Sequence, residues 1–512
     1  MRKFIILFLV GLAITVSSCR QDFVFQTSSK GDLKFSKDTV YLDTVFTNIG
    51  SSTYTLKVYN KSTKDIKIPT IQLGKGQNSK YRMTVDGMTG DNNRVFHNVE
   101  LLAKDSLFIF IEMTTDVADA NPTDFLYTDQ IQFGNETDFQ KVELVTLIQD
   151  AYFLYPQKFN DGTTETLTIG DQKIYGFFLD ENDPINGNEF EWKNDKPYVI
   201  YGYAAVPNDK TLNVHPGARV FFHADSGLII GKEGSLKING DVSNTEALEN
   251  EVIFEGDRLE PDFSDIPGQW GLIWLTDGSK NNEINHLTLK NASYGLLIDH
   301  NNGTDTTIKN TQIYNSSNVG IYAKTARIKG ENIVINNAGV ASLACTLGGN
   351  YEFKHCTFNN NWYSTKQVAV LLNNYLKDDN NQQIPYILEQ ANFSNCIIFG
   401  SNQVEMYFDK SSVSPETNWT APVFSKCQIK FNNFNNQFTN NPDYTFLNDT
   451  SNIIKNGNPN FLSVNNNQLN IGEKSDAKNF GTDVNVPNDI LGKPRNGVFD
   501  LGAYNSIVFP SN

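Results

Sequence analysis

The chain has 512 residues, a formal net charge of −16 and a pI near 4.9. Nucleic acid is excluded as a partner, because binding it requires a basic surface. The length predicts two to four domains, or one elongated repeat body with attachments. The chain is rich in Asn, Thr, Gly, Tyr and Phe. Because this composition favours strands and turns, we expect an all-β protein.

Residues 1–18 are the first predicted element. Two cations precede an apolar run from Phe4 to Val16, which is typical of a secretory signal peptide and shorter than the roughly 20 apolar residues of a membrane span. The sequence VSSC, which ends at Cys19, resembles the bacterial lipobox. This resemblance implies that residues 1–18 are a lipoprotein signal peptide and that Cys19 carries lipid. The alternative is an ordinary signal peptide followed by an incidental cysteine.

Lipid on Cys19 would make the membrane a partner of the chain, because each buried CH₂ group contributes about 0.8 kcal/mol. Residues 19–30 would then be a tether. The other four cysteines lack the close spacing of a zinc or redox site; they are Cys345, Cys356, Cys396 and Cys427.

Residues 31–150 alternate apolar and polar side chains between turns of Gly, Asn and Asp. Tyr54, Leu56 and Val58, for example, should face one side of a strand. This pattern predicts an immunoglobulin-like β-sandwich. The segment resembles the immunoglobulin-like modules of many Bacteroidota envelope proteins, which implies a spacer role. We expect residues 151–198 to be a connecting or capping β segment.

From residue 199 onward, short apolar runs come at close intervals. Three of them begin at Val220, Leu228 and Leu236, eight residues apart, and a glycine stands shortly before each. The spacing and the lack of hairpin turn chemistry argue against hairpins. We interpret the runs as successive faces of one solenoid coil.

A longer repeat supports this interpretation. Six segments carry apolar residues at their first and sixth positions, and the first four segments start 20 to 25 residues apart. Repeats of this length are typical of one coil each, which predicts a right-handed parallel β-helix over residues 199–445. The pairs are Ile284/Leu289, Ile308/Ile313, Ile328/Ile333, Phe353/Phe358, Phe393/Ile398 and Phe424/Ile429.

The same alignment places other residue types in columns. Cys356, Cys396 and Cys427 share the fourth position, so we expect them to stack inside the coil as small apolar residues. Asn291, Asn315 and Asn360 share the eighth position. Asn tolerates the left-handed conformation of a sharp bend, which predicts an asparagine ladder there.

Two insertions and a distinct terminus complete the chain. Asn373–Tyr386 and Ser414–Pro422 should bulge from the coil as loops on a binding face. We expect residues 446–512 to be the end of the β-helix and its cap. Within them, Asn488–Ser506 resembles a C-terminal motif common in secreted Bacteroidota β-helix proteins, and we interpret it as blocking the last open edge.

A β-helix suggests pectate-lyase-like chemistry, which needs an Arg or Lys base and usually acidic calcium ligands. The body of the repeat has only Arg219, Arg258 and Arg327, and the six histidines show no metal-ligand spacing. No catalytic residue or cofactor is predicted from these features, although calcium stays open as a ligand.

One segment, Glu255–Trp274, concentrates charged and aromatic residues. It could bind a cation or a sugar, or act in catalysis. Alternatively, Arg258 fixes a long loop through a salt bridge and a Trp closes the coil. The candidate ligand or cation site comprises Asp257, Arg258, Glu260, Asp262, Asp265 and Trp270.

This segment, together with Lys196–Tyr203 and Asn213–His223, resembles a family of uncharacterised Bacteroidota lipoproteins. The family combines an immunoglobulin-like N-terminus with a β-helix of pectin-lyase-like fold. The resemblance implies lipid anchoring at the outer membrane, facing the cell surface. We therefore expect a non-catalytic binding or scaffold subunit, with an outer-membrane β-barrel protein or a glycan as partner. The alternatives are a cell-surface polysaccharide lyase or glycosidase, or a free glycan-binding lipoprotein.

Overall fold

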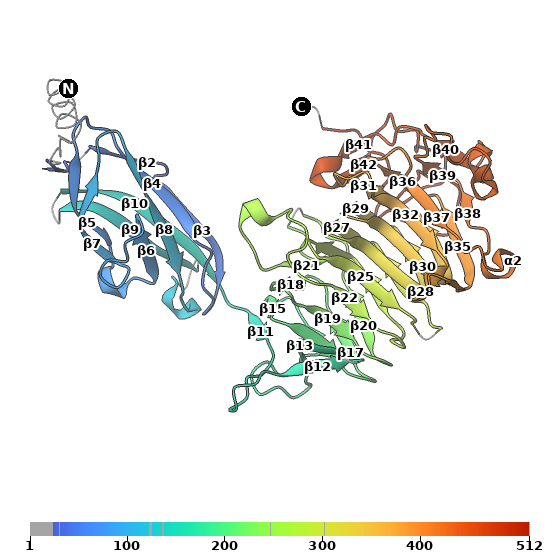
Figure 1. Ribbon diagram of the computed structural model, residues 1–512, viewed down its shortest axis with the longest axis horizontal. Helices are drawn as coiled ribbons and strands as arrows, with labels where there is room; N and C mark the ends of the chain where they lie inside the picture. The colour runs from blue at the N-terminus through green and yellow to red at the C-terminus, as the bar shows by residue number, and fades with distance from the viewer. Residues whose placement is uncertain are drawn as a thin grey trace, which may run out of the picture. The chain divides into compact units, whose positions relative to one another are not determined.

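The computed structural model describes residues 24–29, 31–121, 125–135, 138–170, 172–245, 247–301 and 303–510. The fold is all-β, as the composition predicts (Figure 1). It divides into two compact units, Met1–Asp150 and Ala151–Asn512. The predicted signal peptide and the predicted lipid site at Cys19 lie outside the described residues. Among the described residues, none of the helices has the length and hydrophobicity of a membrane-spanning segment.

The first unit consists of two sheets. One sheet contains β1 (Gln26–Thr27), β3 (Thr39–Phe46), β5 (Ile66–Leu73), β7 (Val95–Leu101), β9 (Leu126–Asn135) and β10 (Asp138–Gln149). The other contains β2 (Leu33–Phe35), β4 (Tyr54–Asn60), β6 (Tyr81–Val85) and β8 (Ser106–Met113). Two short 3₁₀ turns are η1 (Gly76–Asn78) and η2 (Val117–Asp119).

The two sheets of the first unit share one hydrophobic core. On β4, Leu56 and Val58 are fully buried, whereas Thr55 is exposed. Ile109 of β8 and Leu144 of β10 belong to the same core. The alternation of buried and exposed residues is the reason that these segments form strands with one wet face.

The second unit contains three ladders of parallel strands, which we call ladders one, two and three. Ladder one contains β11 (Tyr152–Leu154), β15 (Tyr198–Ile200), β18 (Arg219–Phe222), β21 (Val252–Gly256), β24 (Leu287–Lys290), β27 (Gln312–Ser316), β29 (Val334–Ala338), β31 (Thr357–Asn360), β36 (Ile397–Gly400), β39 (Cys427–Ile429) and β40 (Ile453–Lys455). Ladder two contains β13 (Gln172–Phe178), β16 (Tyr203–Val206), β19 (Gly227–Ile230), β22 (Ile273–Leu275), β25 (Tyr294–Asp299), β28 (Val319–Glu331), β30 (Ala341–Lys354), β32 (Val368–Asn373) and β37 (Met406–Asp409).

Ladder three contains β14 (Glu191–Trp192), β17 (Thr211–Val214), β20 (Ser235–Asn239), β23 (Glu283–Asn285), β26 (Thr306–Lys309), the second halves of β28 and β30, β35 (Leu388–Ser394) and β38 (Val423–Ser425). The remaining elements are β12 (Thr166–Ile169), β33 (Tyr375–Lys377), β34 (Gln383–Pro385), β41 (Phe461–Ser463), β42 (Gln468–Ile471), η3 (Pro261–Phe263), η4 (Pro442–Asn448), η5 (Val464–Asn466) and the short helix α2 (Pro415–Asn418).

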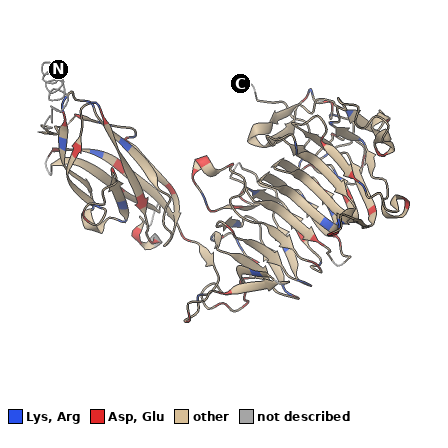
Figure 2. Cartoon of the chain, in the orientation of Figure 1, with Lys and Arg blue, Asp and Glu red and all other residues tan. Residues whose placement is uncertain are grey.

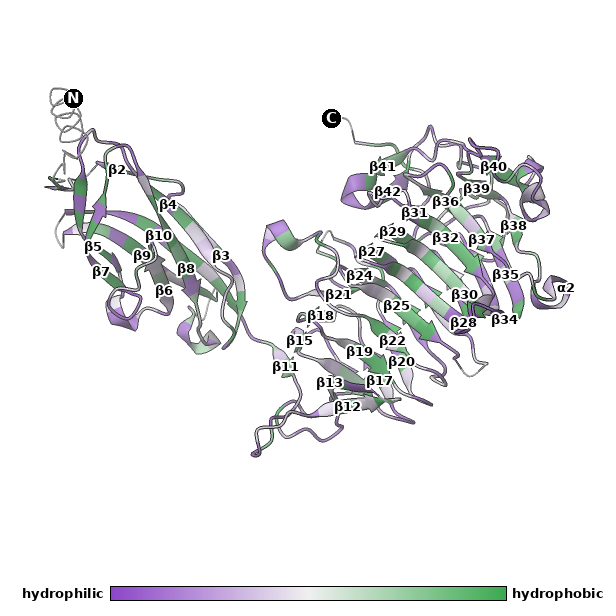
Figure 3. Ribbon diagram, in the orientation of Figure 1, coloured by the Kyte–Doolittle hydropathy of each residue, from purple (hydrophilic) through white to green (hydrophobic). Residues whose placement is uncertain are grey.

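Each circuit of the chain visits the three ladders in turn. The strands that begin at Arg219, Gly227 and Ser235 do not pair with one another. Each pairs instead with one strand of the preceding circuit and one strand of the following circuit. The short runs that we predicted to be successive faces of one coil therefore belong to three different ladders. Hydrophobic residues recur along the strands of the second unit (Figure 3). Their inward side chains form one continuous core through the unit.

Five of the six repeat segments align as the sequence predicts. Ile284 pairs with Ile308, and Leu289 pairs with Ile313. Further along, Phe353, Phe393 and Phe424 stack with ring centroids 5.3 and 4.9 Å apart. Identical positions therefore meet from one circuit to the next, which maximises contact between side chains of similar shape.

The third segment is shifted by two residues from the predicted alignment. Ile308 pairs with Gly330, and Ile328 pairs with Thr306. A Cβ atom on Gly330 would lie 2.6 Å from Phe353 Cδ1 and 2.7 Å from Ile333 Cδ1, so the large neighbours fill the space that a side chain would need. A shift of two leaves the same residues facing inward, because strand periodicity is two. The apolar pattern alone therefore could not distinguish the two alignments.

The cysteine column is confirmed. Cys356, Cys396 and Cys427 are fully buried and free, as is Cys345 in β30. The thiol of Cys396 donates to the carbonyl oxygen of Ser394 at 3.3 Å. Burial raises the pKa of Cys396 and Cys427 well above the ordinary value, so these thiols act as packing residues.

The asparagine ladder is confirmed in part. Asn291 and Asn315 have φ angles of 64° and 57°, and Asn315 Nδ2 donates to Asn291 Oδ1 at 3.2 Å. Asn337 continues the ladder with a φ of 63° and a bond to Asn315. Asn360 lies in the next circuit but has extended backbone within β31; its side chain instead bonds both backbone groups of Ala338.

The C-terminal motif does not block the end of the ladders, contrary to the prediction. Arg495 is 4% exposed and donates to Asn332 Oδ1 and the Gly502 carbonyl. Ala503 N donates to Thr357 Oγ1, and Tyr504 OH donates to Gln312 Oε1. The motif therefore crosses the outer face of ladder one and shields its side chains from solvent.

Aromatic residues cover the last strands instead. Phe446 of η4 stacks on Phe424 at 4.6 Å, and Tyr444 stacks on Phe408 at 4.9 Å. The two predicted insertions have short elements of their own: Asn373–Tyr386 contains the β33–β34 hairpin, and Ser414–Pro422 contains α2.

Substitution of Gly330 by Ala tests the shifted alignment. The added methyl group would overlap the Phe353 ring, so we expect the free energy of unfolding to fall by about 1–3 kcal/mol. Urea denaturation measures this change, and the outward-facing neighbour Lys329→Ala is the matched control. A Gly330→Ala protein as stable as the control would contradict the shifted alignment.

Candidate functional site

The acidic segment Glu255–Trp274 begins with a carboxylate–imidazole pair. Asp257 Oδ2 lies 2.7 Å from His223 Nδ1, and the ring centroids of His223 and Tyr201 are 4.5 Å apart. His223 and Asp257 follow paired strands, β18 and β21, and so meet one circuit apart. Burial raises the pKa of Asp257, with the His223 bond opposing this effect. No sequence pattern indicates this pair, because its members are 34 residues apart.

Arg258 and Glu260 form the salt bridge that the structural alternative expects. Arg258 Nη2 lies 2.9 Å from Glu260 Oε1, and the guanidinium lies 3.7 Å from the centroid of the Phe263 ring. Asp262 is exposed in the turn η3. The acidic residues of this loop stand out in Figure 2. Arg258 is thus held within the loop by one carboxylate and one aromatic ring.

The remaining two candidate residues point to different environments. Asp265 Oδ1 accepts from Asn315 Nδ2 at 3.1 Å, which ties the loop to the asparagine ladder. Trp270 is 1% exposed, stacks on Phe222 at 4.2 Å and donates from Nε1 to the Lys290 carbonyl at 2.8 Å. A ring buried in this way has no free face for a ligand that arrives from solvent.

The six candidate residues therefore do not converge on one point. Asp257 faces His223, Arg258 faces Glu260, and Trp270 lies in the core. Within the described residues, no three His, Cys, Asp or Glu side chains come close enough together to hold a metal ion. The geometry favours fixation of a long loop over a shared ligand or calcium site.

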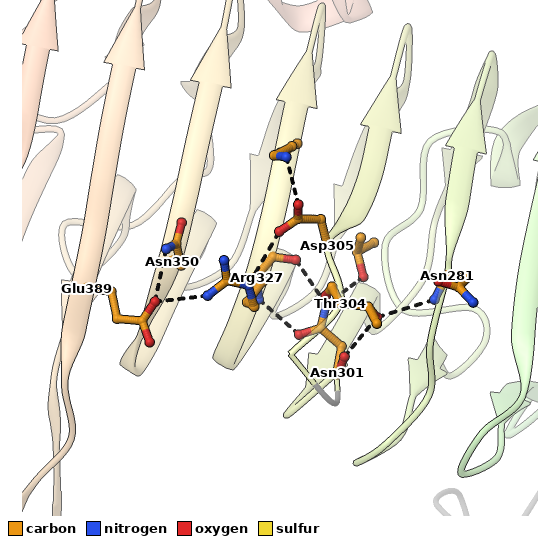
Figure 4. Close-up of polar contacts among 9 residues, drawn as sticks. Asn281, Asn301, Thr304, Asp305, Arg327, Asn350 and Glu389 are labelled. Carbon is orange, nitrogen blue, oxygen red and sulfur yellow. Dashed lines mark hydrogen bonds and ion pairs between the residues drawn. The ribbon is translucent and has the colours of Figure 1, made fainter.

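A second polar group lies on the outer face of ladder three, centred on Arg327 (Figure 4). Arg327 Nη1 lies 2.9 Å from Glu389 Oε2, and its Nε lies 3.4 Å from Asp305 Oδ1. Asn350 Nδ2 donates to the same Glu389 oxygen at 3.0 Å. Lys329 Nζ pairs with Asp305 Oδ2 at 2.7 Å and lowers the pKa of Asp305. We call these five residues the Arg327 row.

The Arg327 row spans successive circuits from the loop before β26 to β35. Arg327 is in register with Asn350 of β30, so the row follows the parallel pairing. Asn301 fixes the Arg327 backbone, since its Oδ1 accepts from the Arg327 amide at 3.0 Å and its Nδ2 donates to the Arg327 carbonyl at 3.0 Å. The row is a polar, partly exposed surface whose charges already compensate one another.

All three arginines of the repeat body are engaged by the chain itself. Arg219 donates to the carbonyls of Glu251 and Leu248 at 2.6 and 2.7 Å. Arg258 is held by Glu260, and Arg327 by two carboxylates. These contacts hold each of the three guanidinium groups against oxygen atoms of the chain itself.

Glu405 is a buried acid that the sequence analysis missed. It is fully buried, and its Oε1 accepts from the Asn402 amide at 2.6 Å. Burial raises the pKa of Glu405 to about 8, against the attraction of Lys430. Lys430 itself donates to the Gly400 carbonyl at 2.5 Å. No sequence signal marks Glu405, because the loop before it has no periodicity that predicts burial.

The raised pKa of Glu405 predicts a pH dependence of stability. The folded chain holds a proton that the unfolded chain releases above about pH 4.3, so this group's contribution falls as pH rises from there to about 8. We expect Glu405→Gln to unfold at higher urea concentration than the unsubstituted chain at pH 8 and to lose part of the pH dependence. The exposed Glu389→Gln is the control; equal pH profiles for both variants would contradict the prediction.

Comparisons with known proteins give little further information. No protein-family model matches the chain, and no curated protein matches it. Among solved structures, a similar one is the crystal structure of a protein of unknown function from Porphyromonas gingivalis W83. It is 13% identical, with a TM-score of 0.16, over 25% of this chain and 55% of that chain. The match spans about half of that structure.

Proposed function

We propose that the chain is an outer-membrane lipoprotein, anchored by lipid on Cys19 and facing the cell surface, that acts as a non-catalytic binding or scaffold subunit. We further propose that the first unit is an immunoglobulin-like β-sandwich and the second a right-handed parallel β-helix. The two sheets around one core support the first assignment. The three parallel ladders, visited in turn by each circuit, support the second.

The observation that carries the scaffold proposal is the unbroken parallel pairing of the second unit. Ladder one alone joins eleven strands from β11 to β40. Every inner strand is bonded on both sides, so the body resists bending and presents a long, fixed surface. A lipid on Cys19 would hold the chain at the membrane and raise its effective concentration at a neighbouring β-barrel protein.

The chemistry of the described polar groups supports a non-catalytic role. The arginines of the repeat body are bound by the chain's own oxygen atoms, and the charges of the Arg327 row compensate one another. A catalytic centre instead pairs a base with an acid or metal ion around a place for substrate.

One observation favours the alternative of a polysaccharide lyase or glycosidase. His223 is half-exposed, and its Nδ1 is held by the largely buried Asp257 at 2.7 Å, an arrangement that suits a general base. We nevertheless expect no cleavage of pectin, alginate or glycosaminoglycans by the purified chain, with or without calcium. Absorbance of released products measures any cleavage. Cleavage that disappears in His223→Gln but persists in the control His97→Gln would establish the lyase or glycosidase alternative.

Substitution of Cys19 by Ser tests the lipid anchor. Without the thiol, no thioether to lipid can form, so we expect loss of radiolabelled fatty acid incorporation and loss of the protein from the membrane fraction. Cys345→Ser is the control, because Cys345 is buried in β30 and should retain labelling. Membrane retention of Cys19→Ser at the level of the unsubstituted chain would contradict lipid anchoring.

Co-purification tests the partner. Leu376 and Ile384 pair across the β33–β34 hairpin and are each 45% exposed, which marks an apolar surface on the first insertion. We expect gentle detergent extraction to recover an outer-membrane β-barrel protein with the chain. Replacing both residues by Ser should reduce this recovery, whereas Phe434→Ser, at another exposed apolar residue, should not. Recovery of a lone monomer would contradict the proposal.

A further inference from the structure

A cavity of about 360 Å³ lies on the outer face of ladder two, between that face and β12. β12 pairs with β13 as an antiparallel hairpin at the start of the second unit (Figure 1). The ladder supplies one wall from β16, β19 and β22, and β12 supplies the opposite wall. The volume is within the range of small-ligand sites. None of the residues discussed above as candidate site residues lines this cavity.

The wall of the cavity is apolar and includes two aromatic rings, those of Phe178 and Trp274. Ala205, Ile229 and Trp274 occupy the same outward position on successive strands, and Leu167 and Ile169 of β12 pack against them. The Trp274 indole nitrogen is buried and has no hydrogen-bond partner within the described residues. Trp274 can therefore offer its ring, and not its N–H, to a ligand.

The rim of the cavity carries two side chains of opposite charge that form no ion pair among the described residues. They are Lys232, after β19, and Asp277, after β22. Across the described part of the chain, neither lies within ion-pair distance of an opposite charge, unlike Asp299 at the same rim. Asp299 lies 2.5 Å from His300 Nδ1 and 2.7 Å from Lys324 Nζ.

The uncompensated charges at the rim therefore sum to zero. A strongly anionic ligand would meet Asp277, and a strongly cationic one would meet Lys232. Together the two groups supply a hydrogen-bond acceptor and a donor, and the Asn208 side chain at the rim has both capacities. The cavity thus combines an apolar ring surface with separate donor and acceptor groups and no net charge.

We infer that this cavity binds one uncharged pyranose ring, as the end of a neutral glycan. The C–H face of a pyranose is apolar. It can therefore pack against the apolar face of the Trp274 ring. Its hydroxyl groups can bond both Lys232 and Asp277. A purely hydrocarbon ligand would use the wall but gain nothing from the two rim groups. This inference goes beyond the proposed scaffold role and depends neither on lipid anchoring nor on a β-barrel partner.

Saturation-transfer NMR on the full-length chain, kept free of sugar-based detergents, tests the inference. The probes are the methyl pyranosides of glucose, galactose, mannose and N-acetylglucosamine. We expect at least one to bind, with affinity about tenfold lower in Trp274→Ala and several-fold lower in Asp277→Ala. The matched control is Leu297→Ala, because Leu297 occupies the same outward position on the next strand but does not line the cavity.

Trp274→Phe keeps an aromatic ring and should retain most of the affinity, which covers the case that Trp274→Ala fails to fold. Absence of saturation transfer to all four probes would overturn the inference. So would affinities that fall as much in Leu297→Ala as in Trp274→Ala. Binding that is unchanged in both Asp277→Ala and Lys232→Ala would also overturn it, since the rim would then have no role.

Discussion

Parallel hydrogen bonding between one circuit of the chain and the next is the interaction on which the second unit depends. A strand such as β18 finds no partner in its own circuit; it is held by β15 and β21, which are about one circuit away in each direction. Parallel pairing places each inward side chain on the equivalent side chain of the next circuit. Core side chains, the asparagines at the bend and the outward-facing residues therefore each form columns that run from circuit to circuit. The same strand register aligns all of these columns.

The columns explain why residues far apart in sequence form the polar groups of this protein. Asp257 meets His223 because both follow strands that pair. Arg327 meets Glu389, 62 residues later, because β28, β30 and β35 are consecutive in ladder three. The same principle brings Trp274 beside Ile229 in the outward row of ladder two. Surface sites on the second unit thus consist of residues from several successive circuits. Loops between the strands extend these sites or cover them.

The pairing register between successive circuits could be predicted from the sequence where bulky apolar residues recur at the same position. It could not be predicted where a glycine replaces them. The phenylalanine column of Phe353, Phe393 and Phe424 gave the alignment directly, and the buried cysteines followed from it. Gly330 broke the pattern, because a missing side chain leaves no apolar signal and a shift of two keeps the inward face. The cover of ladder one by the C-terminal motif and the separate environments of Asp257 and Trp270 were not predictable, since both depend on contacts between distant segments.

The register of ladder three is the most direct test of this account. Thr307 pairs with Lys329 in the structure, whereas the alignment from the apolar pattern would pair Lys309 with Lys329. All three side chains face outward. Paired residues on adjacent strands lie about 5 Å apart and residues offset by two about 8 Å apart, and a disulfide needs Cα atoms closer than about 7 Å. The observed register predicts rapid oxidative cross-linking in Thr307→Cys/Lys329→Cys and none in Lys309→Cys/Lys329→Cys. The reverse result would contradict it.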